Sequence, residues 1–432
     1  MRKMPLVTML LFCTMSLAHA RTQNPQQQRL EYAQPDFWLG IAQHSTDFVN
    51  DHAFNAEQGF YYSELDQTGQ VVSDKVYLIA LSRMIYAQSF IAEQNLGDIN
   101  RAKKATDFLV KQMLAEDELG PYFIAEYNVN EKRAAKANTL KVAEQAYGLN
   151  GLVEYYRVSQ DKDLLVTIRR LYRAFFERFH DDSYGGFYDG YHLDTQTQIK
   201  TKSYNSTVYV ATAFLINLME VDIERQASYQ TILKELMALA AQHFIDDSGW
   251  IVENFDRRWQ PQWSDWQRQG QHTIGVVGHN LQYAWLMLRA NRWSFISEQE
   301  RQQYQYIATE VLEHMLDNAS WDKELGGFHD AFQRETNQVM WNTNKAWWQQ
   351  AEGILALDAA LKSSHLSAKQ RQKFAVAQRA TIGFFKRYFV DEKHGGEFFN
   401  VTKTGVAIQN ELKGQRGKSA YHTVELAKFM ID

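Results

Sequence analysis

The chain has 432 residues, of which 45% are hydrophobic and 22% charged, a balance typical of a globular protein. Its formal net charge is −5 at pH 7 and no basic block occurs, which argues against nucleic acid as a partner. Aromatic residues make up 13%, more than a core requires, so a pocket that stacks on sugar faces is an alternative to simple core packing.

The first twenty residues predict a signal peptide. Arg2 and Lys3 precede an apolar run that ends in Ala18-His19-Ala20, the small-x-small form cleaved after Ala20. No later apolar run has the length to cross a bilayer, so we expect a periplasmic or secreted protein without membrane contact. The single cysteine, Cys13, lies inside the signal, which excludes disulfides, thiolate zinc sites and cysteine nucleophiles from the mature chain.

A phrase that combines acids, glycine and aromatics recurs along the chain. It reads FNAEQGFYY at 54, AEDELGPYF at 115, HDDSYGGFYDGYH at 180, IDDSGWIVENF at 245, WDKELGGFHDAF at 321 and DEKHGGEFF at 391. We expect each glycine to end a helix in a left-handed conformation before a short extended segment. A calcium loop is the less favoured interpretation, because its oxygens need stricter spacing.

Between the glycines, apolar residues return every three or four positions, which predicts helices. The expected ranges are 36–52, 74–95, 98–116, 138–159, 161–179, 203–220, 225–244, 279–292, 297–317, 345–363, 367–389 and 419–430. Six helix pairs with a common connector favour an all-α (α/α)6 barrel, with short β connectors at one mouth, as a single domain over residues 21–432. The longest interval, with DRRWQPQWSDWQRQGQHTIGVV at 256–277, is a candidate lid or substrate wall.

Two of the thirteen histidines stand out by position. His279 begins a predicted inner helix directly after the candidate lid, and His422 begins the last helix, so both should project toward one mouth of the barrel. Each is a candidate for proton transfer, and a structural histidine is the alternative for each.

Five segments resemble a known family. GHNLQYAWLMLRA, NKAWWQQAEGILAL, DKVYLIALSRMIYAQS, KSYNSTVYVATAFL and SAYHTVEL occur within residues 74–425. In this order they resemble the N-acylglucosamine 2-epimerase superfamily, which includes cellobiose 2-epimerases and mannose isomerases. The resemblance implies an (α/α)6 barrel and proton transfer at C2 of a reducing mono- or disaccharide through an enediol or enediolate, without metal or cofactor.

The resemblance also implies roles for single residues. His279 and His422 would be the acid/base pair, Arg83 the cation beside the sugar oxygens, and Glu352 the carboxylate that orients His279. Substrate contacts are implied for five further side chains: Asn205, Tyr209, Gln282, Trp347 and Trp348.

Two of these positions depart from the family pattern. Tyr209 stands where a further histidine is usual, and Gln282 stands where a glutamate is usual. Either 2-epimerisation or aldose–ketose isomerisation is compatible with the motifs, in a monomer or a homodimer. The alternatives are a glycoside hydrolase or polysaccharide lyase on the same barrel, or a degenerate periplasmic sugar-binding protein.

Overall fold

The helices of this chain are of two kinds, and their burial separates them. In the computed structural model, α6 (Lys162–Phe179) buries one face through residues three or four positions apart, including Leu164, Ile168 and Leu171. By contrast, α5 (Val142–Ser159) is buried on almost every side. The structure describes residues 31–263, 268–269, 272–334, 336, 338–339 and 343–432, so the predicted signal peptide lies outside the described residues.

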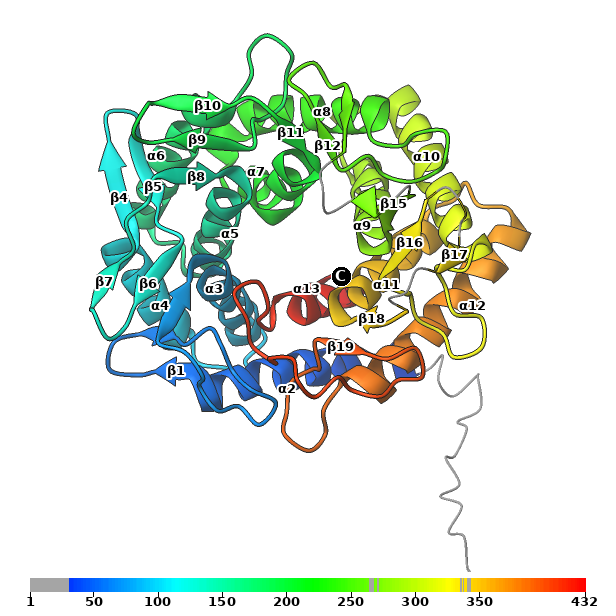
Figure 1. Cartoon of the computed structure of the whole chain (residues 1–432), viewed down its shortest axis with the longest axis horizontal. Coiled ribbons are helices and arrows are strands. Elements are labelled where there is room, and N and C mark those ends of the chain that lie inside the picture. The colour runs from blue at the N-terminus through cyan, green and yellow to red at the C-terminus, as the bar shows by residue number, and fades with distance from the viewer. Residues whose placement is uncertain (1–30, 264–267, 270–271, 335, 337, 340–342) are drawn as a thin grey trace, which may run out of the picture.

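The two kinds of helix form two concentric rings (Figure 1). The inner ring contains α3 (Leu78–Glu93), α5, η1 (Asn205–Leu215, a π-helix) continued by α7 (Ile216–Val221), α9 (Val277–Arg289), α11 (Trp347–Lys362) and α13 (Tyr421–Ile431). The outer ring contains α2 (Pro35–Ala53), α4 (Ile99–Gln112), α6, α8 (Gln226–His243), α10 (Glu298–Asp317) and α12 (Ala368–Phe384), which η4 (Phe385–Phe389) extends. Because α13 packs against both α3 and α2, the ring is closed, and the predicted (α/α)6 barrel is confirmed.

The strands are short and lie in the connectors. They are β1 (Phe54–Asn55), β2 (Phe60–Tyr61), β3 (Lys75–Tyr77), β4 (Leu114–Asp117), β5 (Gly120–Phe123), β6 (Glu126–Asn128), β7 (Arg133–Ala134), β8 (Thr139–Lys141), β9 (Gly190–His192), β10 (Thr197–Ile199), β11 (Lys202–Ser203), β12 (Asn254–Phe255), β13 (Pro261–Gln262), β14 (Arg268–Gln269), β15 (His272–Val276), β16 (Ala331–Gln333), β17 (Gln338–Val339), β18 (Lys345–Ala346) and β19 (Asn400–Val401). All pairings among them are antiparallel.

Several predicted helix ends are wrong because strands occupy them. The helices expected from residues 74, 138 and 345 begin at Leu78, Val142 and Trp347, after β3, β8 and β18. The helix expected to reach residue 116 ends at Gln112, and β4 follows it. The backbone groups of these segments pair with neighbouring connectors, as when β3 pairs with β6, so tertiary pairing overrides a helical period that continues through the sequence.

The recurrent phrase forms a turn with the expected positive φ, but its glycine does not end a helix. The preceding helices end earlier, with Phe54, Met113, His180, Phe244, Asn318 and Val390 as their C-caps. All six glycines have a positive φ: 82° at Gly59, 107° at Gly120, 72° at Gly186, 77° at Gly249, 79° at Gly327 and 67° at Gly396. In three connectors a buried lysine also binds the aspartate of the phrase. These pairs are Lys202–Asp181 at 3.1 Å, Lys345–Asp322 at 2.9 Å and Lys413–Asp391 at 2.6 Å. The phrase therefore fixes the geometry of the connectors.

The described part of the candidate lid belongs to the connector layer. β13, β14 and β15 come from this interval, and residues 264–267 and 270–271 lie outside the described part of it. Trp259 is buried and stacks on His243 with ring centroids 5.4 Å apart, so this tryptophan packs in the protein interior. Within the described residues, no single helix combines the length and apolarity of a membrane span; one pair, Asn205–Val221 with Ile223–His243, meets the criteria only jointly and is bent by 101°.

Candidate active site

His279 lies in the first turn of α9 and has a partner on each ring nitrogen. Nδ1 is 2.9 Å from both carboxylate oxygens of Glu253, and Nε2 is 3.2 Å from the hydroxyl of Tyr209. The ring of Tyr204 stacks on the imidazole with centroids 4.1 Å apart. A carboxylate on Nδ1 favours the proton on that nitrogen and stabilises the charged ring.

The carboxylate that orients His279 is Glu253, which the sequence analysis did not single out. Glu352, expected in this role, lies beside the other histidine. Glu253 belongs to the IDDSGWIVENF connector, immediately before β12. Two other connectors have an acid at the equivalent position, Asp189 and Asp330, so the sequence does not set Glu253 apart.

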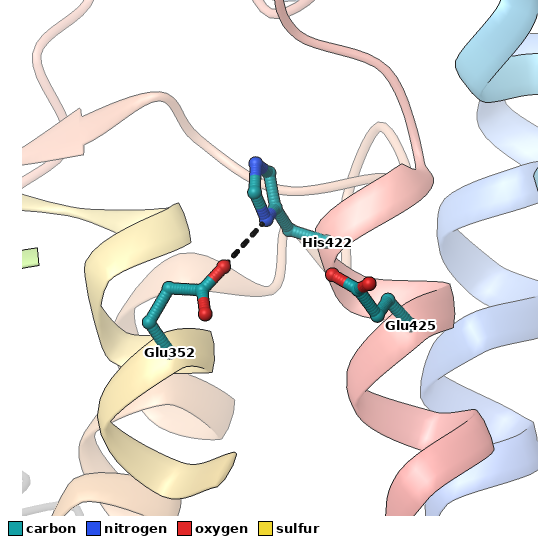
Figure 2. Close-up of side chains that lie close together, drawn as sticks. All are labelled: Glu352, His422 and Glu425. Atoms are coloured by element: carbon teal, nitrogen blue, oxygen red, sulfur yellow. Dashed lines mark ion pairs between the residues drawn. The ribbon is translucent and has the colours of Figure 1, made fainter. Parts of the chain in front are cut away.

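His422, in the first turn of α13, is buried against Glu352 of α11. Its Nδ1 is 3.1 Å from Oε1 of Glu352, and the second ring nitrogen lies on the far side of the ring (Figure 2). Burial, and then the charges of Arg83 and Lys418, hold the pKa of His422 well below its ordinary value. Burial and the charge of Glu425 raise the pKa of Glu352 well above its ordinary value. Each shift favours the neutral form of its group.

Trp348 lies close to both histidines. Its ring centroid is 5.6 Å from that of His279 and 6.1 Å from that of His422, while the buried Trp347 is 5.6 Å from His422. Gly278 makes this placement possible, because a Cβ there would come within 2.4 Å of the Trp348 ring. A glycine is therefore needed immediately before His279 to leave room for the ring of Trp348.

Arg83 of α3 is buried among aromatic rings. Its guanidinium lies 4.2 Å from the ring centroid of Tyr147 and 5.0 Å from that of Tyr421, and it donates to the carbonyl of Gly417. Its Nε is buried without a hydrogen-bond partner. The charge of Arg83 acts to lower the pKa of both His422 and Glu352. Arg83, the cation expected beside the sugar oxygens, therefore lies in the same region as His422.

Gln282 and Asn205 are placed differently. Gln282 is buried; it accepts from the Tyr204 hydroxyl at 2.8 Å and donates to Glu352 Oε1 at 3.3 Å. Asn205, at the start of η1, is exposed. The remaining expected residues converge at the starts of the inner helices.

A further carboxyl, Glu425, lies below His422 on α13. Atoms of Glu352, His422 and Glu425 approach within 4.8 Å of one another, and all three side chains are buried. Burial raises the pKa of Glu425 to about 7. A cavity of about 550 Å³ is found elsewhere, at the opposite ends of the inner helices, where Arg289, Asp358 and Phe429 are among its lining residues.

Known proteins resemble the chain in sequence and in fold. The model of the N-acylglucosamine 2-epimerase family matches residues 59–426. A cellobiose 2-epimerase from Dictyoglomus turgidum is 24% identical over 340 residues, which cover 74% of this chain and 78% of that protein. A second one, from Ruminococcus albus, is 22% identical and covers 83% of this chain and 88% of its own.

Among solved structures, a D-mannose isomerase superposes with a TM-score of 0.78 at 17% identity, covering 93% of this chain and 98% of its own. Because a family model matches most of the sequence and the observed barrel agrees with it, the chain belongs to the N-acylglucosamine 2-epimerase family, whose members are isomerase-class enzymes.

Proposed function

We propose that the protein epimerises or isomerises a reducing mono- or disaccharide by proton transfer at C2. The observation that carries the proposal is the pair of imidazoles on α9 and α13, both of which lie beside the ring of Trp348. Inversion of one carbon needs a base on one face and an acid on the other, and two histidines can supply both. A positioned acid or base typically accelerates such a step about 10²- to 10⁴-fold.

In this proposal one imidazole removes the C2 proton of the open-chain sugar. The C–H electron pair then moves into an enediolate over C1, C2 and the C1 oxygen, where the charge of Arg83 stabilises it. Return of a proton to C2 from the other imidazole gives the epimer, whereas delivery to C1 gives the ketose. Trp348, and Trp347 beside it, would contact the sugar ring.

The contacts give the hydrolase alternative little support. A hydrolase needs two carboxyls facing each other across the pocket, and the connector acids Asp189 and Asp330 could be proposed for this. Asp189 accepts hydrogen bonds from Thr201 at 2.6 Å and Ser203 at 2.5 Å, and Asp330 accepts one from Gln349 at 2.5 Å, so each already has hydrogen-bond partners within the protein. Glu352 and Glu425 do face one another, but both are buried, whereas a glycosidase needs the scissile bond between its two carboxyls.

Turnover in D2O tests the proposal. Reducing sugars, with cellobiose and mannose first, are incubated with the enzyme and followed by NMR. Deuterium should appear at C2 of an epimer, or at C1 of a ketose. His279→Asn and His422→Asn should each abolish conversion, and one of them should still exchange the C2 proton of unreacted substrate. Full conversion by both variants, or release of a sugar fragment without exchange, would overturn the proposal.

We also propose that residues 1–20 direct export and are removed after Ala20, on the composition of that segment. Cell fractionation with N-terminal sequencing tests this, and a retained Met1 in the cytosolic fraction would contradict it.

A further inference from the structure

Glu425 is a buried carboxyl that the proposed reaction does not use. It lies three residues after His422, on the same face of α13, and points toward Glu352 of α11 (Figure 2). Glu352 is 0% exposed and Glu425 is 3% exposed. Two carboxylates this close in a dry environment repel each other strongly when both are ionised.

The hydrogen bonds of this cluster are incomplete. Tyr421 donates to Glu425 at 2.7 Å, and Gln282 donates to Glu352 Oε1. However, Glu352 Oε2 is buried without a hydrogen-bond partner. A buried oxygen of this kind normally accepts a hydrogen bond, so a proton on Glu425 is the simplest missing donor.

Charge balance indicates one proton rather than none. The nearby charged and titratable groups come from several elements: Arg83 and Tyr86 of α3, Tyr147 of α5, Tyr204 and Tyr209 at the start of η1, Arg289 of α9, Tyr421, His422 and Lys428 of α13, and Lys418 before α13. Lys428 binds Glu154 at 2.8 Å and Arg289 lies 3.4 Å from Glu220, so each has a carboxylate of its own.

Lys418 donates to the carbonyls of Glu397 and Lys413 at 2.8 Å and has the charge of Glu397 beside it. Arg83 is then left to balance the cluster, and one cation balances one carboxylate. The second carboxyl is then neutral. A divalent cation in the same place would add two positive charges beside Arg83, which makes a proton the better occupant.

We propose that Glu352 and Glu425 share one proton in the resting enzyme. In the second half of the proposal, the pair accepts a second proton, from Nδ1 of His422, when Nε2 of the same ring removes the C2 proton of the sugar. The C–H and Nδ1–H bonds break while Nε2–H and a Glu352 O–H form, so the ring stays neutral beside Arg83. This second half rests on the proposed function. Glu425 is thus a positioning residue that acts through Glu352.

The surroundings of His422 support this transfer. Burial and the charges of Arg83 and Lys418 lower the pKa of His422, so a charged imidazolium is disfavoured and release of the Nδ1 proton is favoured when Nε2 gains one.

NMR of the substrate-free enzyme tests the shared proton. With 13C-labelled glutamate side chains and 15N-labelled histidine, one of the two buried carboxyls should stay protonated near pH 6, with His422 carrying its proton on Nδ1. Glu425→Gln should shift the titration midpoint of Glu352 downward by at least about one pH unit, because the like charge is gone. Unchanged titration of Glu352 in this variant, or zinc binding that displaces the proton, would overturn the proposal.

Kinetics test the coupling to His422. In Glu425→Gln, the limb of the kcat/KM pH profile that reports titration of the carboxyl pair should move to lower pH, with KM nearly unchanged. Glu425→Asp should return this limb part of the way to its wild-type position. Glu144→Gln, a mostly buried glutamate that pairs with Arg416 outside the cluster, is the matched control and should leave the profile unchanged. An unmoved limb in Glu425→Gln would refute the coupling. If the wild type converts no sugar but titrates as expected, the shared proton stands and the proposed function fails.

Discussion

The side-chain amide of Gln282 donates to Oε1 of Glu352 across 3.3 Å, and this contact joins the surroundings of the two histidines. Gln282 also accepts from the hydroxyl of Tyr204, whose ring stacks on His279. Glu352 in turn lies against His422. A neutral amide suits this position, because it can donate to one group and accept from the other.

Gln282→Glu should therefore impair the protein. The variant places a third carboxyl in a buried cluster that already contains Glu352 and Glu425, and burial together with like charge will raise its pKa. We expect stability to fall as pH rises from 6 to 8, more than in the wild type, with at least a tenfold loss of kcat at pH 8. Thermal unfolding at both pH values measures this. Equal melting temperatures for variant and wild type at pH 8 would contradict it.

Glu253→Gln tests the orientation of His279. The amide can still hydrogen-bond Nδ1, but it no longer selects the Nδ1–H tautomer or stabilises a charged ring. We expect kcat to fall about 10²-fold with little change in KM, within the range that a positioned acid or base contributes. Glu253→Asp should retain part of the activity. A lower affinity at unchanged kcat would instead assign Glu253 to substrate binding.

The sequence predicted the barrel because its signal is local and repeated. Each copy of the phrase contains a glycine with a positive φ, as at Gly186. Between the phrases, the spacing of apolar residues indicates which side of each helix is buried. Strand segments such as β8 were missed because their extended conformation depends on pairing with β9, a partner about fifty residues away.

The site was predictable only in part, for a related reason. His279 and His422 stand at helix starts, a position that the sequence reveals. Glu253 reaches His279 from a connector, and Glu425 resembles any other polar residue on a helix until α11 places Glu352 opposite it. Contacts between separate repeats carry no periodic signal, so they required the three-dimensional structure.

Gly278→Ala should disturb the site sterically. The added methyl group would lie 2.4 Å from the ring of Trp348, which must then move from its position beside both histidines. We expect a large loss of kcat/KM with a folded protein, measured by kinetics and near-ultraviolet circular dichroism. Gly40→Ala is the control, because no heavy atom lies within 4 Å of its added Cβ, and it should keep full activity. Equal activity of both variants would show that Trp348 is not required there.

Tyr209 provides a test of the hydroxyl on His279. Burial raises the pKa of this phenol well above its ordinary value, so it stays protonated and can donate to Nε2. Tyr209→Phe should lower turnover, whereas Tyr209→His, which supplies a group that titrates near neutral pH, should raise it. Unchanged turnover in both variants would place Tyr209 outside the reaction.

The last prediction concerns stability and follows from Glu425. Its pKa is raised from 4.5 in the unfolded chain to about 7 in the folded protein. The folded state therefore binds this proton more tightly, so its contribution to stability is complete below about pH 4.5 and is lost as pH rises through 7. The difference in pKa sets an upper limit of about 3 kcal/mol.

Glu425→Gln removes this titration while it keeps the shape of the side chain. Histidines with lowered pKa values act in the opposite direction at acid pH, and comparison of variant with wild type cancels them because they are common to both. From pH 5 to pH 8, the free energy of unfolding of the variant should therefore rise relative to that of the wild type, as measured by urea denaturation. Parallel pH profiles for the two proteins would show that Glu425 is ionised throughout, and would contradict the shared proton as well.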